Sequence, residues 1–158
     1  MWVVVGVVAV VVLVATYLTW IASRVDRLHG RVAATFSALD AQSVRRAAAA
    51  AAMDLAEVQT AAKAVLGAHP DDREAAENDL TRVLRWAEVE AGPAAVAAAV
   101  EPSRRLALAR QVHTDVVRDA LAVRRRWLVR LLRFSRRHAE PRFFDIDDPV
   151  LDEPAAPS

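Results

Sequence analysis

The hydrophobic pattern divides the chain into one uninterrupted apolar run and a longer stretch of helical periodicity. Residues 2–21 read WVVVGVVAVVVLVATYLTWI and contain no charged side chain. Twenty helical residues at about 1.5 Å each span roughly 30 Å, which is the thickness of the hydrocarbon core of a bilayer. The run therefore predicts a transmembrane helix, with residues 1–22 as the membrane anchor.

Aromatic residues stand at both ends of this run, Trp2 at one end and Tyr17 and Trp20 at the other. Such residues concentrate at the two membrane–water interfaces. The alternative is a cleavable secretory signal. No Lys or Arg precedes the run, and the run is longer than a usual signal core, so we expect a retained anchor.

Basic residues follow the apolar run at once. Arg24, Arg27 and Arg31 lie within a few positions of it, opposed only by Asp26. Arginine next to a span resists translocation, so the flank that carries it stays in the cytoplasm. The sequence predicts a single-pass protein of the bacterial inner membrane, with its N-terminus outside and its body cytoplasmic.

Apolar residues recur every three to five positions from residue 23 to residue 67, which predicts a single helix over this range. The alanine run 47–52 is expected to continue this helix, because alanine is the strongest helix former. Gly67 and Pro70 form its stop signal. Two further helices are expected over about 72–91 and 102–137.

The expected fold is all-α. The transmembrane helix would continue into an antiparallel, up-down-up bundle of long helices over residues 23–139. An acidic, proline-rich tail over 140–158 is expected to be extended, with Phe143 and Phe144 docked on the bundle.

The third expected helix has apolar residues at alternating steps of three and four, which predicts the seam by which it packs on its neighbours. The seam residues are Leu106, Ala109, His113, Val116, Ala120, Val123 and Trp127. On this seam His113 is expected to be a buried, hydrogen-bonded structural residue rather than a catalytic base.

Composition removes several classes of chemistry. The 158 residues include no cysteine, which excludes disulfides, thiolate zinc sites and cysteine nucleophiles. The four histidines have no metal-ligand spacing, and neither a glycine-rich phosphate loop nor a GxSxG motif occurs. We therefore expect no enzymatic activity, cofactor, metal or small-molecule substrate.

Arginines gather near the end of the third expected helix, interleaved with aliphatic residues. The candidate surface comprises Arg124, Arg125, Arg126, Arg130, Arg133, Arg136 and Arg137. It could contact anionic lipid, another protein, or the acidic residues Asp145, Asp147 and Asp148 of the tail. Nucleic acid is disfavoured, because stacking aromatic residues are not interleaved with the arginines and the chain is membrane-tethered.

Three segments resemble motifs of the LemA family. The first is RVAATFSALDAQ at residues 31–42, followed by Arg45 and Arg46. The second comprises Ala109-Arg110, His113-Thr114-Asp115 and Val117-Arg118-Asp119, and the third is Phe143-Phe144-Asp145. The family's DLIPNLV stretch is replaced here by residues 48–53, and its Tyr-Asn pair by His113-Thr114. The alanine, arginine and valine bias is typical of high-GC bacteria, which suggests a diverged, actinobacterial LemA-like protein.

The resemblance implies a membrane-anchored bundle of long helices, a cytoplasmic body and no assigned enzymatic activity. It also implies that Phe36, Leu39 and Val117 are packing positions, and that Asp40 with Arg45 or Arg46 bridges helices. The leading expectation is a membrane-anchored, non-enzymatic scaffold that binds other proteins. The alternative is a peripheral lipid-binding or membrane-organising module that uses the arginine-rich third helix.

Overall fold

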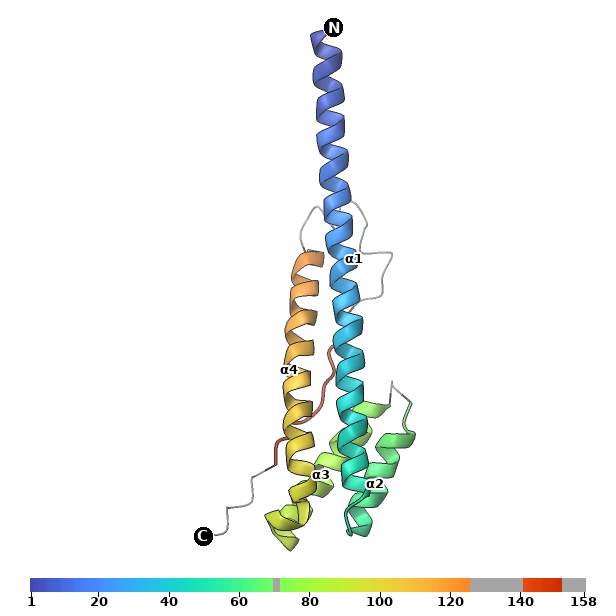
Figure 1. Cartoon of the computed structure of the whole chain (residues 1–158), viewed down its shortest axis with the longest axis vertical. Coiled ribbons are helices and arrows are strands. Elements are labelled where there is room, and N and C mark those ends of the chain that lie inside the picture. Colours follow the sequence, from blue (N-terminus) through green and yellow to red (C-terminus); the bar gives the residue numbers. More distant parts are fainter. Residues whose placement is uncertain (70–71, 126–140, 152–158) are drawn as a thin grey trace. The chain divides into compact units, whose positions relative to one another are not determined.

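The computed structural model of the chain describes residues 1–69, 72–125 and 141–151. These residues form helices and connecting segments and contain no strand. The helices are α1 (Trp2–Ala51), α2 (Ala56–Gly67), α3 (Arg73–Ala91), the 3-10 helix η1 (Pro93–Val96) and α4 (Ala97–Arg125), as labelled in Figure 1. The expected all-α fold, with a long apolar N-terminal helix, is confirmed.

The chain divides into two compact units. The first contains Met1–Ala34 and Asp115–Arg142, and the second contains Thr35–Thr114 and Phe143–Ser158. Helices α1 and α4 each contribute residues to both units.

The first unit contains the apolar part of α1. An 18-residue window of this helix has a mean hydropathy of 2.5, and only 6% of the window is buried. A core helix of a soluble protein would bury most of such a window. Trp2, Tyr17 and Trp20 are likewise half or more exposed. One helix of the described chain is therefore long enough and apolar enough to span a membrane.

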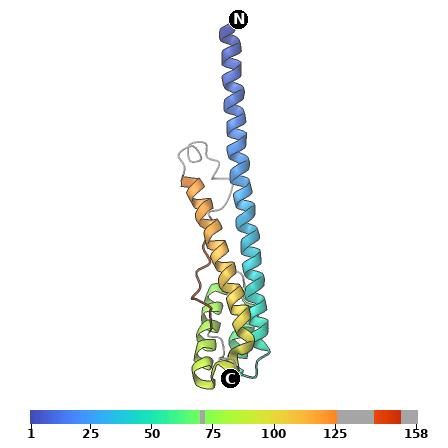
Figure 2. The same ribbon diagram turned by 60° about the vertical axis from the view of Figure 1, so that its left-hand side comes forward.

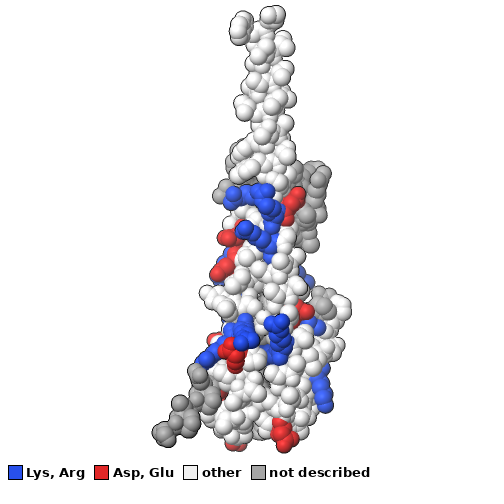
Figure 3. All heavy atoms as spheres, in the orientation of Figure 1, with Lys and Arg blue, Asp and Glu red and all other residues white. Residues whose placement is uncertain are grey.

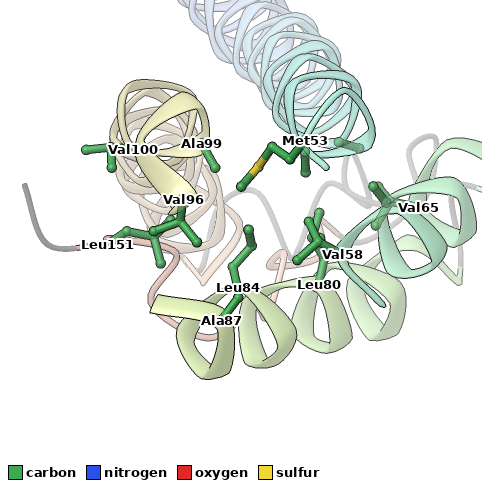
Figure 4. Packing of buried hydrophobic residues seen from close by; sticks show 13 residues of the cluster. Met53, Val58, Val65, Leu80, Leu84, Ala87, Val96, Ala99, Val100 and Leu151 are labelled. Carbon is green, nitrogen blue, oxygen red and sulfur yellow. The ribbon is translucent and has the colours of Figure 1, made fainter. Parts of the chain in front are cut away.

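In the second unit, α2 and α3 pack beside the end of α1 and the start of α4, as both Figure 1 and Figure 2 show. Their shared core contains side chains from every helix of the unit, together with Leu151 from the C-terminal segment. Figure 4 shows Met53, Val58, Leu80 and Leu84 pointing toward one another in this core. On α3, Leu80, Leu84 and Ala87 are buried in this core, whereas Ala91 is exposed.

The expected continuous helix over 23–67 is wrong, because the chain turns between α1 and α2. The amides of Ala52 and Met53 donate to carbonyls three residues earlier, and Leu55 is extended. The side-chain amide of Gln59 donates to the Met53 carbonyl, 2.8 Å away. Alanine side chains add little apolar surface, whereas the turn lets Val58 and Val65 of α2 pack on α3. Tertiary packing therefore outweighs the helix propensity of the alanine run.

The third long helix begins earlier than expected, at Ala97 rather than at residue 102, so Pro102 lies inside it. Proline lacks the amide hydrogen that would donate to the carbonyl four residues back. The first turns of α4 nevertheless stay helical, because Ala99, Val100 and Ser103 are buried on the same side. The remainder of the expected helix, residues 126–137, lies outside the described residues.

The seam of α4 is also shifted by one residue at one point. Leu106, His113 and Ala120 are buried as expected, but Val117 is fully buried while Val116 is only partly so. Steps of four, from 113 to 117, follow the 3.6-residue helical period more closely here than a step of three.

Residues 141–151 have no helix or strand. From Phe143 to Leu151 they form an extended segment that belongs to the second unit. Phe144, Ile146 and Leu151 are at most 5% exposed, whereas Phe143 is 46% exposed. The prediction that both phenylalanines dock is thus correct for Phe144 and wrong for Phe143. Only Phe144 docks, because neighbouring side chains of an extended segment point in opposite directions.

Candidate functional site

The arginine surface predicted from the sequence cannot be placed on the structure. Arg124 and Arg125 end helix α4, but their side chains lie outside the described residues, as do the five further arginines, Arg126, Arg130, Arg133, Arg136 and Arg137. The lipid, protein and self-pairing hypotheses for this surface therefore stay predictions.

The structure instead places a polar cluster at the centre of the second unit. Its members come from three helices and are at most 2% exposed; they are Ser43, Arg46, Glu77, Thr81 and Ser103. The Nη1 atom of Arg46 donates to Glu77 Oε2 at 2.5 Å and to Thr81 Oγ1 at 3.0 Å. Its Nε atom donates to Ser103 Oγ at 2.9 Å. Ser43 donates to the other carboxylate oxygen of Glu77, 2.5 Å away.

This polar cluster joins α1, α3 and α4 through a single guanidinium. Desolvation lowers the pKa of Arg46 from its ordinary value, while the charge and hydrogen bond of Glu77 raise it and the charge of Arg85 lowers it. The net lowering means that burying the cation costs stability at neutral pH, and that this cost falls only as pH rises through the lowered pKa. The Nη2 atom of Arg46 adds to the cost, because it has no hydrogen-bond partner among the described residues.

A second ion pair ties α1 to α3 at the edge of the same unit. Arg73, the first residue of α3, pairs with Asp40 of α1 and donates to the Ala68 carbonyl at 2.9 Å. Asp40 and Arg46 therefore bridge helices as the LemA resemblance implied, but each does so with a partner on α3 rather than with the other. The carboxylate partner of Arg46 is Glu77, and Arg45 is exposed.

His113 is 1% exposed, and its Nδ1 atom is hydrogen-bonded to the Thr35 hydroxyl at 3.0 Å. The ring of Phe36 lies 5.9 Å from the imidazole and 6.2 Å from the ring of Phe144. The prediction of a buried, hydrogen-bonded histidine is confirmed. Its surroundings are those of a packing residue, since it is buried and the aromatic ring of Phe36 lies beside it.

The C-terminal segment is held on the second unit mainly through its backbone. Arg110 donates to the Ile146 carbonyl at 2.9 Å, and Arg85 donates to the Asp148 carbonyl at 2.6 Å. Asp147 donates its amide hydrogen to the side chain of Asn78 at 2.8 Å. Together with Phe144 and Leu151, these contacts make the segment part of the folded body.

An apolar groove lies on the surface between α1 and α4. Its lining comprises Thr35, Ala38, Gln42, Arg105, Leu108, Ala109 and Val112, and its volume is about 310 Å³. Leu108 and Val112 are 63% and 47% exposed, so the groove is open to solvent. The first and last lining positions on each helix are seven residues apart, or roughly 10 Å along the axis. Two small residues, Ala38 and Ala109, let an incoming backbone approach closely.

The buried polar cluster was not predicted as a unit, although the sequence places two of its members on buried helix faces. Ser43 falls on the periodic stripe of α1, four residues after Leu39 and four before Ala47. Glu77 lies three and seven residues before Leu80 and Leu84, on the same face of α3. A carboxylate on a buried face requires a buried partner, and that requirement is the signal that could have indicated the pair.

In the described part of the chain, no group of three or more His, Cys, Asp or Glu residues could hold a metal ion. No family model matches the sequence, and neither a curated protein nor a solved structure matches it. Over residues 1–69, 72–125 and 141–151, the structure defines an all-helical class of protein with one helix capable of spanning a membrane. The relationship to the LemA family stays a prediction.

Proposed function

We propose that this chain is a non-enzymatic, membrane-anchored scaffold whose helical body binds an amphipathic helix of another protein. In this proposal α1 is a retained anchor of the bacterial inner membrane, with the N-terminus outside and the body in the cytoplasm. Arg24, Arg27 and Arg31, just beyond the apolar run, support this orientation.

The observation that carries the proposal is the apolar groove between α1 and α4. Leu108 and Val112 are an exposed pair one helical turn apart, beside the small residues Ala38 and Ala109. A partner helix inserts apolar side chains at i, i+3 or i+4, and i+7, which matches the two-turn length of the lining. Arg105 and Gln42 stand among the lining residues, where they can pair with the polar face of the helix.

A non-enzymatic role is supported by how the buried polar groups are used. Arg46, Glu77 and Ser103 bond one another across three helices and have no exposed surface, so a substrate could not reach them without unfolding of the body. A catalytic group needs access to its substrate. We assign these residues to holding the helices in register.

The proposal includes a distant relationship to the LemA family. Its support is positional. Of the three residues that the resemblance marks as packing positions, Leu39 and Val117 are fully buried, whereas Phe36 is 37% exposed. Asp40 and Arg46 each bridge to α3. Phe144 of the closing motif is buried against the body as well.

Site-specific photo-crosslinking in living bacteria tests the function. A photoreactive residue at Leu108 should form a crosslink of definite mass to another protein, and the same residue at Val89, an exposed position on α3, should not. Val112→Glu, introduced beside the photoreactive Leu108 position, should abolish the crosslink, because it places a charge in the groove. Equal crosslinking from both positions would contradict the proposal. Crosslinks to lipid alone would also contradict it and would favour the lipid-binding alternative.

A further inference from the structure

Three arginines form a small polar hollow on α1 directly after its apolar segment. The hollow is lined by Arg24, Arg27, Leu28 and Arg31 and has a volume of about 210 Å³. At about 100° per residue, the three arginines lie within roughly 60° of one another around the helix. All three are exposed. Figure 3 shows the N-terminal end of the chain without charged atoms, and basic atoms gathered where that uncharged stretch ends.

The helix itself supplies no counter-charge to this hollow. No acidic residue stands three or four positions from Arg24, Arg27 or Arg31, the spacings at which helical side chains meet. Asp26 is two residues from Arg24, at about 200° around the helix, and so points to the opposite side. Arg27 instead has another arginine three residues before it and four residues after it. Like charges at these spacings destabilise a helix, and a bound anion relieves that repulsion.

The position of the hollow matches the depth of lipid phosphates. Arg24 is three residues past Ile21, or roughly 4.5 Å beyond the apolar run, and the headgroup layer on each side of a bilayer is about 5–7 Å thick. Side chains on a helix lean toward its N-terminus, so Arg27 and Arg31 reach back toward the bilayer. Long arginine side chains near the end of a span extend to the interface in the same way.

An aromatic pair fixes the first arginine at this depth. The rings of Tyr17 and Trp20 are stacked, with centroids 6.2 Å apart. The guanidinium of Arg24 lies 5.7 Å from the centroid of the Trp20 ring. Trp and Tyr prefer the headgroup level, so the cation–π contact places a guanidinium where phosphate is found.

We infer that Arg24, Arg27 and Arg31 form a binding site for the phosphodiester headgroup of an anionic phospholipid. Guanidinium groups suit this ligand, since their N–H donors match the oxygens of a phosphate in a bidentate geometry. This inference rests on the proposed membrane anchor. It concerns the apolar helix and not the arginines of residues 124–137.

Native mass spectrometry of the full chain released from neutral detergent micelles tests the site. The wild-type chain should retain phosphatidylglycerol in preference to phosphatidylcholine. The variant R24Q/R27Q/R31Q should bind phosphatidylglycerol roughly 100-fold more weakly, at about fivefold for each arginine near the surface. The matched control R45Q/R82Q/R118Q removes three exposed arginines elsewhere and should bind as the wild type does.

Equal retention of phosphatidylglycerol by the wild type and by R24Q/R27Q/R31Q would overturn the site, as would equal loss in the control variant. Displacement of the lipid by millimolar inorganic phosphate would show that free phosphate, not lipid, is the ligand. Failure of the anchor is a distinct outcome. In that case the full-length wild-type chain would stay soluble without detergent and would not sediment with membranes.

Discussion

Arg46 and Glu77 are two opposite charges with no exposed side-chain surface. Removing a charge from water costs several kcal/mol, and the attraction between the two groups offsets this cost only if their remaining polar atoms are bonded. Ser43, Thr81 and Ser103 bond three of those atoms. The cluster therefore favours the one arrangement of α1, α3 and α4 in which all five side chains meet.

The substitution Glu77→Gln should destabilise the second unit by about 3–5 kcal/mol, because it leaves the Arg46 cation buried without its counter-charge. Urea unfolding of the purified protein in mild detergent measures the loss. Glu90→Gln is the matched control, since Glu90 is an exposed residue of the same helix. Equal losses for the two variants would contradict the buried ion pair.

Val117 and Val116 give a second test at the residue scale. Val117→Asp should cost about 3 kcal/mol or more, because it buries an unpaired charge, whereas Val116→Asp should cost clearly less. Val117 is fully buried and Val116 only partly so. A larger loss at Val116, measured by the same unfolding curves, would place the seam of α4 where the sequence first suggested it.

The elements differ in how far the sequence predicted them. Helix α3 was predicted to within a residue, because Asp72 precedes its first residue and Gly92 and Pro93 follow its last. Gly92 has a φ of 85°, a conformation that suits glycine. The turn at residues 52–55 was missed, since no glycine or proline marks it and its cause lies in the packing of Val58 and Val65 on α3.

The apolar segment and the docking of Phe144 were also predictable, the first from length and hydropathy and the second from an aromatic pair in an acidic tail. Which phenylalanine docks was not, because the register of an extended segment depends on its partners. Here the partners are Arg85 and Arg110, which donate to the backbone carbonyls of Asp148 and Ile146.

The C-terminal segment gives a prediction at the scale of the element. Phe144→Ala should destabilise the second unit by about 3–5 kcal/mol, because the ring fills space beside Phe36, Leu39 and Leu106. Phe143→Ala, an identical change at the neighbouring but exposed position, should cost less than about 1 kcal/mol. Thermal unfolding compares them. Similar midpoints for the two variants would show that the segment does not contribute to the core.

The core of the second unit offers a further element-scale test. Leu84→Ala should cost about 2–5 kcal/mol, since Leu84 is fully buried between side chains of α2, α3 and η1 (Figure 4). Leu66→Ala on α2 removes the same atoms from a side chain that is 42% exposed, and a much smaller loss is expected there. A loss at Leu66 as large as that at Leu84 would contradict the packing of α2 on α3.

At the scale of the whole molecule, the proposed function depends on which side of the membrane the body occupies. A partner helix from the cytoplasm can reach the groove beside Leu108 only if the body is cytoplasmic. The charge pattern beside the apolar run predicts this side, because three arginines directly follow the run.

Cysteine labelling in spheroplasts tests this claim most directly, since the chain contains no native cysteine to interfere. Val89→Cys places one thiol on an exposed position of α3. We expect a membrane-impermeant maleimide to label it only after the membrane is broken, while a cysteine inserted after Met1 is labelled in intact spheroplasts. Labelling of Val89→Cys in intact spheroplasts, or its release as a shortened soluble chain, would contradict the anchored, cytoplasmic body.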